Sequence, residues 1–287
     1  MDSLVALVSF QSSPFARSAI VTTLRASGCV YAEAEAALLM SAARTPSDLA
    51  AMVDQRIAGL PLEHVVGWAE FCGLRIAVDP GVFVPRRRTE LLVREAVALI
   101  RQKAVHADQA VERRSAVLVD LCSGSGAVGV AVVVALSRFE PYAVELSAVD
   151  IDPAAVRCAG RNLGFHGGQV YESDLYEPLP LTLRGHVDVL VANSPYVPTD
   201  AMGLLPPEAR MHEPQVALDG GADGLDVLRR VAAEAPQWLA LGGHLLVETS
   251  DDQAPTAVET FACNGLVPRV ARSDELDATV VIGTRST

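Results

Sequence analysis

Basic and aromatic side chains are scarce in this sequence. It has 23 Lys and Arg against 35 Asp and Glu, a formal net charge of -12, and only 5% aromatic residues. A general nucleic-acid binder needs clustered Lys and Arg to neutralise phosphates, so this composition opposes that class. One dense basic run exists, Arg86-Arg87-Arg88, and we interpret it as a solvated or domain-bridging surface rather than a nucleic-acid patch.

The sequence also lacks a long apolar run, paired cysteines and spaced histidines. Its longest apolar stretch, 127–136, is shorter than the roughly 18 residues of a membrane span, and we expect a buried helix there. The opening MDSLVALVSF places Asp2 where a secretory signal carries positive charge. The cysteines form no C-x-x-C pair and the histidines show no ligand spacing. We therefore expect a cytoplasmic protein with no membrane association and no metal site.

The first part of the chain has a helical pattern. Ala and Leu recur at steps of three and four residues over 13–60, and Pro46 after Thr45 is typical of a helix start. Pro61 is expected to end this helical region. Alternating apolar residues over 71–84 surround Asp79-Pro80-Gly81, which predicts a hairpin with its turn at those residues.

After Arg86 the pattern changes to strands that alternate with helices, which is typical of a mostly parallel sheet with crossover helices. Two final β segments with no helix between them should form an antiparallel edge. The predicted strands are 116–121, 143–149, 169–171, 187–192, 244–248, 266–271 and 278–282. We accordingly expect an α/β protein with a helical substrate-recognition domain over 1–70, a hairpin connector over 71–84 and a larger domain over 85–287.

A glycine-rich segment, VLVDLCSGSGAVGV over 117–130, joins the first buried strand to a helix. Small residues at such a turn let the backbone approach a ligand closely. Gly124, Gly126 and Gly129 satisfy G-x-G-x-x-G, so a dinucleotide-binding fold and a tight turn without a ligand are both alternatives here.

Carboxylates follow the next two strands. Asp150 stands at the carboxyl end of its strand, where it can accept both hydroxyl hydrogens of a ribose. Asp152 precedes Pro153 and is better explained as a helix N-cap. Asp174 follows the third strand and is suited either to the exocyclic amine of an adenine or simply to solvation of its loop.

The most informative segment is Asn193-Ser194-Pro195-Tyr196, directly after a buried strand. An amide and backbone carbonyls can accept the hydrogens of a planar amino group while a tyrosine ring packs on its face. A proline turn with a satisfied Asn is the alternative.

These residues carry a resemblance. Asn193-Ser194-Pro195-Tyr196 resembles the N-P-P-Y motif of S-adenosylmethionine (AdoMet)-dependent methyltransferases that modify planar amino groups, and VDLCSGSG resembles their cofactor loop. Three further segments resemble the HemK-type protein glutamine N5-methyltransferases, which modify peptide-chain release factors: EHVVGWAEFCGL, VFVPRRRTELLV and HEPQVALDGGADGLDVLRRV. The resemblance covers both predicted domains.

The resemblance implies a small helical domain followed by a class I methyltransferase domain, with a doubly wound, mostly parallel seven-stranded sheet and an antiparallel last strand. It implies that 122–126 wraps the methionine part of AdoMet, that Asp150 holds the ribose and that Leu175 stands near the adenine. The full set expected to bind AdoMet is Asp120, Cys122, Ser123, Gly124, Ser125, Gly126, Asp150, Asp174, Leu175 and Asn193. Asn193, Ser194, Pro195 and Tyr196 would grip the glutamine, with Asn193 and Tyr196 in catalytic roles.

Several positions depart from the family pattern. Ser194 replaces the first proline, Cys122 replaces the first loop glycine, and Arg87-Arg88 stand where a proline and an acidic residue are usual. The segment 275–279, ELDAT, lacks the usual glycine and arginine. These departures suggest a divergent, paralogous subgroup whose protein substrate is a release factor or another glutamine-bearing protein.

Three rival functions remain open at this point. A nicotinamide dehydrogenase would explain the glycine loop and Asp150 but not the segment that begins at Asn193. An adenine N6-methyltransferase would use the same segment on a flipped base, which the acidic charge opposes. A catalytically silent module that binds AdoMet or a protein would follow if Ser194 and the loop changes had removed activity.

Overall fold

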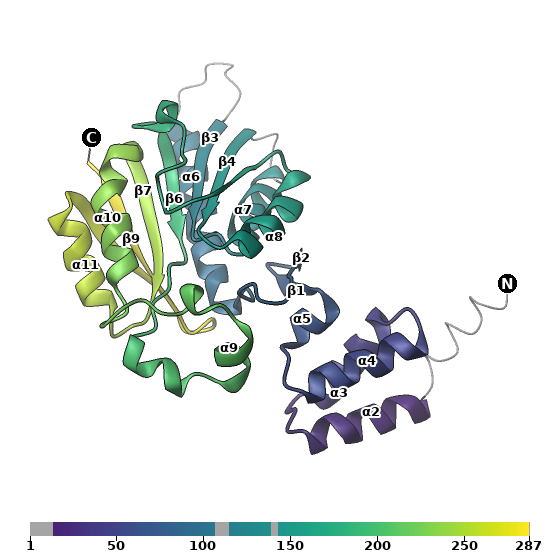
Figure 1. The fold of residues 1–287 in the computed structure, drawn as a ribbon. Helices are drawn as coiled ribbons and strands as arrows, with labels where there is room; N and C mark the ends of the chain where they lie inside the picture. Colours follow the sequence, from purple (N-terminus) through teal and green to yellow (C-terminus); the bar gives the residue numbers. More distant parts are fainter. Residues whose placement is uncertain (1–13, 107–114, 139–142, 287) are drawn as a thin grey trace.

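The chain folds into a helical bundle, a short hairpin and a larger α/β unit (Figure 1). The structure is a computed structural model that describes residues 14–106, 115–138 and 143–286; the opening segment MDSLVALVSF lies outside these residues. The helices before the hairpin are α2 (Pro14–Ala26), α3 (Ala32–Ala42), α4 (Pro46–Ile57) and α5 (Leu62–Val66).

The bundle has its own apolar core. Leu24, Leu39 and Leu49 come from three different helices and are buried together. Thr45 caps α4, since its side-chain oxygen accepts a hydrogen bond from the backbone N–H of Asp48 at 3.0 Å. Pro61 was predicted to end the helical region. This prediction is wrong, because the short helix α5 begins directly after it.

The hairpin turn differs from the predicted one. Strands β1 (Trp68–Phe71) and β2 (Leu74–Ala77) pair antiparallel around Cys72 and Gly73, whose φ angles are 51° and 71°. Positive φ at both central residues is the geometry that matches the twist of a two-residue hairpin. The predicted turn at Asp79-Pro80-Gly81 is a separate turn after the hairpin, closed by a hydrogen bond from the Val82 N–H to the Asp79 carbonyl. Local turn signals did not distinguish these two positions.

The larger unit contains one seven-stranded sheet in the order β5-β4-β3-β6-β7-β9-β8. The first five of these strands run parallel, whereas β9 pairs antiparallel with both β7 and β8. This confirms the predicted sheet and its antiparallel last strand. The strands are β3 (Ser115–Leu121), β4 (Ala143–Asp150), β5 (Gln169–Glu172), β6 (Val187–Ala192), β7 (Leu239–Thr249), β8 (Leu266–Ser273) and β9 (Ala278–Arg285).

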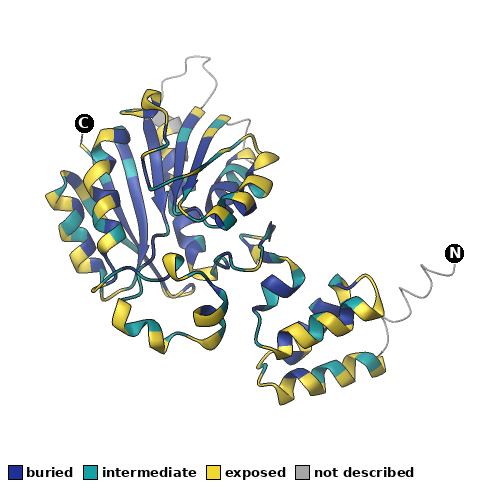
Figure 2. Cartoon of the chain, viewed as in Figure 1, coloured by how far each residue is buried: buried dark blue, intermediate teal, exposed yellow. Residues whose placement is uncertain are grey.

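Helices cover both faces of the sheet (Figure 1). One core lies under α6, α7 and α8, and the other under α10 and α11. Figure 2 shows the strands buried and the outer helix faces exposed. The apolar stretch 127–136 falls in α7 and is mostly buried, as predicted. The helices are α6 (Glu90–His106), α7 (Ala127–Ser137), α8 (Pro153–Gly164), α9 (Pro207–His212), α10 (Asp226–Trp238) and α11 (Ala254–Cys263).

The order of the strands determines where a ligand can bind. The chain runs outward from β3 through β4 to β5, then returns to place β6 on the other side of β3. In register, Leu121 at the end of β3 lies opposite Val149 of β4 and Ala192 of β6. The loops after these strands therefore meet at a topological switch point, where open α/β sheets bind ligands. No described helix is long and apolar enough to cross a membrane.

Candidate active site

The loop from β3 to α7 is a tight turn. Cys122, Gly124 and Gly126 have φ angles of 53°, 54° and 75°. A side chain on Gly124 would meet nothing within 4 Å, so its backbone borders open space. A Cβ on Gly126 would lie 2.2 Å from a Leu163 methyl, so this glycine allows α8 to pack against the turn. Gly126 thus allows this packing and is not among the residues that line the adjacent hollow; its cofactor contact stays a prediction.

Asp150 is held beside this loop. Its Oδ2 accepts a hydrogen bond from the Gly124 N–H at 2.7 Å, and its Oδ1 accepts one from the Asp152 N–H at 2.9 Å. Burial raises the pKa of Asp150, and these backbone donors oppose the rise. Each carboxylate oxygen can accept a second hydrogen bond, so both remain available to a diol. Asp152 caps α8 as predicted, because its side chain accepts from the Ala154 N–H at 2.8 Å.

Asp120 lies deeper, at the end of β3. Its Oδ2 accepts a hydrogen bond from the Gly129 N–H at 2.9 Å, which joins the strand to the first turn of α7. Burial is the main reason that the pKa of Asp120 is raised to about 8. The side chain also lines the hollow at the strand ends, so it can contact a ligand as well as hold the helix.

The loop after β5 supplies Asp174 and Leu175. Asp174 forms an ion pair with Arg230 of α10 at 2.8 Å, and both residues line the same hollow. Leu175 is buried with a φ of 49°, a backbone conformation that turns the chain sharply at this point. The structure therefore brings an acidic and an apolar side chain from the loop after β5 to the hollow, where the acidic one contacts α10.

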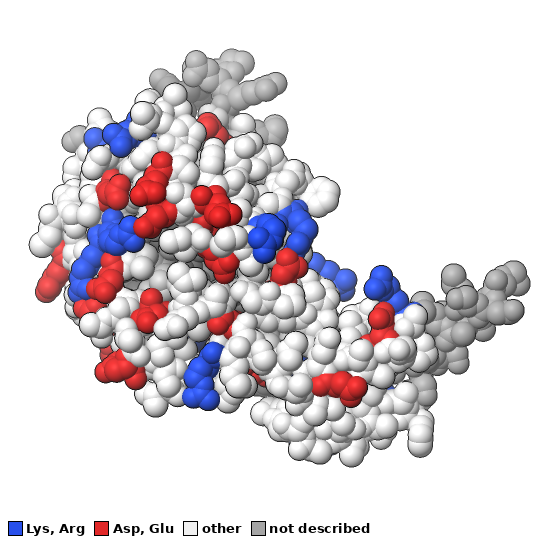
Figure 3. Space-filling model, in the orientation of Figure 1, with Lys and Arg blue, Asp and Glu red and all other residues white. Residues whose placement is uncertain are grey.

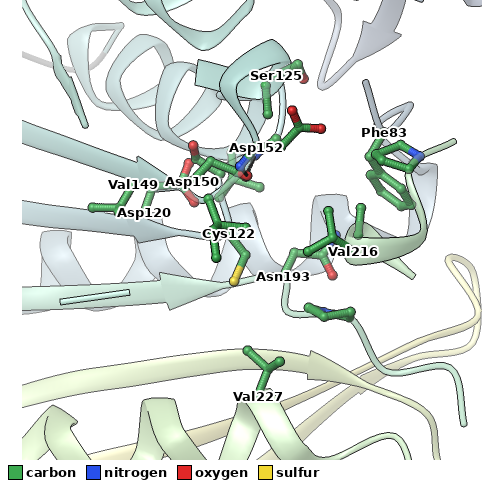
Figure 4. Close-up of a pocket in the computed structure, with 18 of the residues that line it drawn as sticks. Phe83, Asp120, Cys122, Ser125, Val149, Asp150, Asp152, Asn193, Val216 and Val227 are labelled. Carbon is green, nitrogen blue, oxygen red and sulfur yellow. Dashed lines mark hydrogen bonds between the residues drawn. The ribbon is translucent and has the colours of Figure 1, made fainter. Parts of the chain in front are cut away.

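These loops enclose a hollow that we call the cofactor hollow. In Figure 4, Asp120, Cys122 and Asp150 gather at the strand ends, and Phe83, Val216 and Asn193 lie across from them. Its chemistry fits AdoMet: Asp150 offers acceptors for ribose hydroxyls, the Gly124 backbone borders free space, and apolar side chains surround them. Its lining includes these residues predicted for the cofactor: Asp120, Cys122, Ser123, Gly124, Ser125, Asp150, Asp174, Leu175 and Asn193.

A second hollow, which we call the acceptor hollow, adjoins the first. Asn193 lines both hollows, while Ser194 and Tyr196 line the second. Pro195 lines the cofactor hollow. The Asn193 amide nitrogen lies 3.5 Å from the Thr89 hydroxyl oxygen, an arrangement in which Nδ2 donates and Oδ1 is left to accept from a ligand. Asn193 therefore stands where two ligands would meet.

Tyr196 is fixed at both ends. Its hydroxyl donates to Glu248 Oε1 at 3.4 Å, and its backbone carbonyl accepts from Gln253 Nε2 at 2.9 Å. Burial raises the pKa of both Tyr196 and Glu248, so the hydroxyl stays protonated at neutral pH. Glu248 Oε2 is buried without a hydrogen-bond partner in the part of the chain that the structure describes. The ring is thereby held in one orientation.

The segment 218–226 supports the loop that contains Asn193 and Tyr196. The Val197 N–H donates to the Leu218 carbonyl at 3.0 Å, and the Val197 carbonyl accepts from the Gly220 N–H at 2.9 Å. A Cβ on Gly220 would come within 2.5 Å of the Pro195 carbonyl oxygen. The Gln253 amide also donates to the Asp223 carbonyl at 3.0 Å, which ties the segment to the loop.

Thr89, Glu248 and Gln253 belong to no motif in the sequence that predicts a role for them. Glu248 carried a weak signal, since it is a carboxylate at the end of an otherwise apolar strand. Thr89 and Gln253 carried none, because their partners are 104 and 57 residues away in the chain. Among the described residues, no group of three or more His, Cys, Asp and Glu could hold a metal ion.

An arginine of the helical bundle is bonded to the wall of the acceptor hollow. Arg56 of α4 pairs with Glu35 of α3 at 2.7 Å and with Glu208 of α9 at 2.6 Å. Those two carboxylates raise the pKa of Arg56, although burial acts against them. Glu208 lines the acceptor hollow, so this ion-pair network joins the bundle to the wall of the site.

Comparison with known proteins agrees with this geometry. No model of a known protein family matches the chain. The chain is 37% identical over 245 residues to the release factor glutamine methyltransferase of Geobacter sulfurreducens, covering 84% of this chain and 79% of that protein. It is 35% identical over 216 residues to a 4-amino-L-phenylalanine/4-methylamino-L-phenylalanine methyltransferase of Streptomyces pristinaespiralis. This match covers 74% of this chain and 71% of that protein.

Among solved structures, a methyltransferase from Pyrococcus furiosus superimposes with a TM-score of 0.51 at 15% identity, covering 75% of this chain and 90% of that one. This likeness shows the methyltransferase fold. The sequence identity to the Geobacter protein, which covers 84% of this chain, is more specific. The chain belongs to the release factor glutamine methyltransferase family.

Proposed function

We propose that this enzyme transfers the methyl group of AdoMet to the side-chain amide nitrogen, N5, of a glutamine in a peptide-chain release factor. The observation that carries the proposal is the position of Asn193, which lines both the cofactor hollow and the acceptor hollow. A single polar side chain at that junction can hold an amide nitrogen against a methyl donor. The relatives named for release factor methylation support the same substrate.

The chemical difficulty is that the lone pair of an amide nitrogen is delocalised into its carbonyl. AdoMet supplies a methyl group activated on a sulfonium. The Asn193 Oδ1 and the Ser194 backbone carbonyl accept the two hydrogens of the glutamine amide, which turns the nitrogen lone pair toward the methyl. Thr89 holds the Asn193 amide in that orientation, and the Tyr196 ring fixes the amide plane.

Positioning of this kind can contribute up to about 7–11 kcal/mol of the barrier reduction in favourable cases. A strong general base is not required, because the nitrogen becomes acidic once it is alkylated. Glu248 faces the Tyr196 hydroxyl, and we assign it to orienting that ring.

The rival functions are less well supported. A dehydrogenase would have no use for Asn193 and Tyr196 beside the cofactor hollow. A nucleic-acid substrate is opposed by the net charge of -12. On the face in Figure 3, basic and acidic side chains are interspersed rather than gathered into one basic surface. We therefore propose a protein substrate, no direct nucleic-acid contact and a cytoplasmic location.

Labelled methyl transfer tests the proposal. Purified release factors and a cell extract are incubated with AdoMet carrying a labelled methyl group, and labelled bands are mapped by peptide mass spectrometry. Label on a release-factor glutamine is the expected result, and Asn193→Ala is the inactive control. Label on an adenine, or on a different protein, would overturn the proposed substrate.

Ser194 allows a test of the silent-module alternative. Its backbone N–H donates no hydrogen bond to another backbone group among the described residues, so proline can replace it without losing one. Proline would also restrict φ, and we expect Ser194→Pro to raise kcat by a few-fold at most. Activity confined to the Ser194→Pro variant, with none in the natural chain, would instead establish a silent module.

We further propose that the helical bundle recognises the protein substrate. Phe15, Val30 and Tyr31 expose large apolar side chains on it, with exposed fractions of 87%, 83% and 75%. Exchange of these side chains for serine should raise KM for the protein substrate and leave AdoMet affinity unchanged. An unchanged KM in the triple variant would contradict this role.

A further inference from the structure

The charges that line the acceptor hollow are mostly paired. Arg86 meets both oxygens of Glu213, at 2.7 and 2.6 Å. Glu208 is paired with Arg56 at 2.6 Å. These two ion pairs join the walls of the hollow, and within each pair the opposite charges largely neutralise each other.

Arg88 is different. It lines the acceptor hollow together with Asn193 and Tyr196, yet it forms no ion pair with any described carboxylate, and its side chain is exposed. It stands next in sequence to Thr89, whose hydroxyl contacts Asn193. A guanidinium in this position is available to a ligand.

Arg88 has no ion-pair partner among the described acidic groups around the hollow. Glu248 interacts with it electrostatically, but Glu248 is buried and bonded to the Tyr196 hydroxyl, and it forms no ion pair with the exposed Arg88. The Tyr196 hydroxyl, which also interacts with Arg88, carries no charge at neutral pH. Glu63 of α5 lines the hollow as well, and among the described residues it forms no ion pair with Arg88. An uncompensated cation therefore lies close to the place where the methyl acceptor would bind.

We propose that Arg88 determines specificity by binding a carboxylate that the substrate carries close to its acceptor nitrogen. The inference rests on the proposed function, because it requires the acceptor hollow to hold the methyl acceptor. The planar guanidinium suits a carboxylate, which it can bind through two parallel hydrogen bonds. The carboxylate comes either from an acidic side chain next to the target glutamine or from the α-carboxylate of a free amino acid.

Two matched substrate pairs distinguish these sources. The first pair is a short glutamine peptide with Asp beside the glutamine and the same peptide with Asn there. The second pair is 4-amino-L-phenylalanine and its carboxamide. Each pair keeps the size of the group and removes the negative charge. Binding is measured by calorimetry with S-adenosylhomocysteine present, and kcat/KM is measured with AdoMet.

The protein variants are Arg88→Gln and, as the matched control, Arg87→Gln. Arg87 is the neighbouring exposed arginine; it pairs with Glu275 at 3.5 Å and lines neither hollow. In the natural chain we expect the charged member of one pair to be preferred by about tenfold, as for a hydrogen bond to a charged group. The ratio of binding or kcat/KM between the charged and the neutral member should fall to about one in Arg88→Gln and persist in Arg87→Gln. AdoMet affinity should be equal in all three proteins.

A preference within the peptide pair identifies a flanking acidic residue, and one within the amino-acid pair identifies a free amino acid. The absence of a preference in both pairs, or an equal preference in Arg88→Gln, would overturn the assignment. The proposed release-factor function can fail separately. In that case glutamine peptides would neither bind nor accept methyl, while the amino-acid pair would still report the role of Arg88.

Discussion

The two hollows that meet at Asn193 are built in different ways. The walls of the cofactor hollow come largely from loops that directly follow strands, and backbone N–H groups hold its key carboxylate, Asp150. The acceptor hollow is assembled from the bundle, the segment that contains Arg86 and Arg88, the loop after β6 and the region of α9. The first hollow depends on local turns, and the second depends on contacts between distant segments.

This difference suggests that the two sides respond to substitution in separable ways. A change on the cofactor side should alter AdoMet affinity, and one on the acceptor side should alter turnover. Asn193 belongs to both sides, which makes it the sharpest test of the division.

The largest effect is expected from Asn193→Ala. Loss of one positioned polar group that orients the reacting nitrogen should lower kcat by about 10²- to 10³-fold. AdoMet affinity should change far less, because Asp150 and the loop at Gly124 are untouched. Single-turnover kinetics and calorimetry measure the two quantities, with Asn264→Ala as a control at the end of α11. An equal loss of turnover and affinity would remove the proposed division of roles.

On the cofactor side, Asp150→Ala should weaken AdoMet binding by about 10- to 100-fold, as expected for hydrogen bonds to a charged group. The matched control is Asp152→Ala, which removes a carboxylate that also lines the cofactor hollow but is already bonded to the Ala154 N–H. Because Asp152 caps α8, that control should lower helix stability and leave AdoMet affinity nearly intact. Similar affinities for the two variants would contradict the role of Asp150 as the ribose ligand.

A smaller effect is expected from Gln253→Leu. This change removes the donors that hold the Tyr196 and Asp223 carbonyls, and two such hydrogen bonds correspond to a loss of about tenfold in kcat. AdoMet affinity should stay the same, since Gln253 lines neither hollow. Gln237→Leu on the exposed side of α10 is the control. Unchanged kcat in Gln253→Leu would show that the loop does not need this support.

The last prediction concerns folding stability rather than turnover, and it involves Asp120 and pH. Its pKa rises from 3.8 to about 8 on folding, chiefly because the group is buried. Between those values the unfolded chain binds fewer protons than the folded one, so this group lowers the free energy of unfolding as pH rises. Asp120→Asn keeps an acceptor for Gly129 and does not titrate. Urea unfolding at pH 5 and pH 8 should show the variant gaining stability relative to the natural chain at the higher pH; parallel profiles would contradict this.

The same contrast explains how much the sequence could predict. The strands and the loops after them follow from apolar alternation and glycine placement, so Asp150, Gly124 and Asn193 line one hollow as expected. The structure places Gly126 in helix packing, a distinction that needs the position of Leu163 on another helix. Local patterns carry this information only where neighbours in space are also neighbours in sequence.

The acceptor side was less predictable for the same physical reason. The Arg56 and Glu208 pair joins residues 152 positions apart, and no local pattern indicates such a contact. The hairpin turn at Cys72 and Gly73 was also missed, because the Asp79-Pro80-Gly81 signal was stronger locally, and the pairing of Trp68 with Ala77 decided the register.

The shared wall at Asn193 has a thermodynamic consequence. If each ligand completes part of the other's site, their affinities are linked, and the factor by which AdoMet tightens acceptor binding equals the factor by which the acceptor tightens AdoMet binding. The spent cofactor, which lacks the methyl group, would share most of that linkage. Dissociation of the spent cofactor would then loosen the methylated product, so a high concentration of spent cofactor would lengthen the time that a modified substrate stays bound.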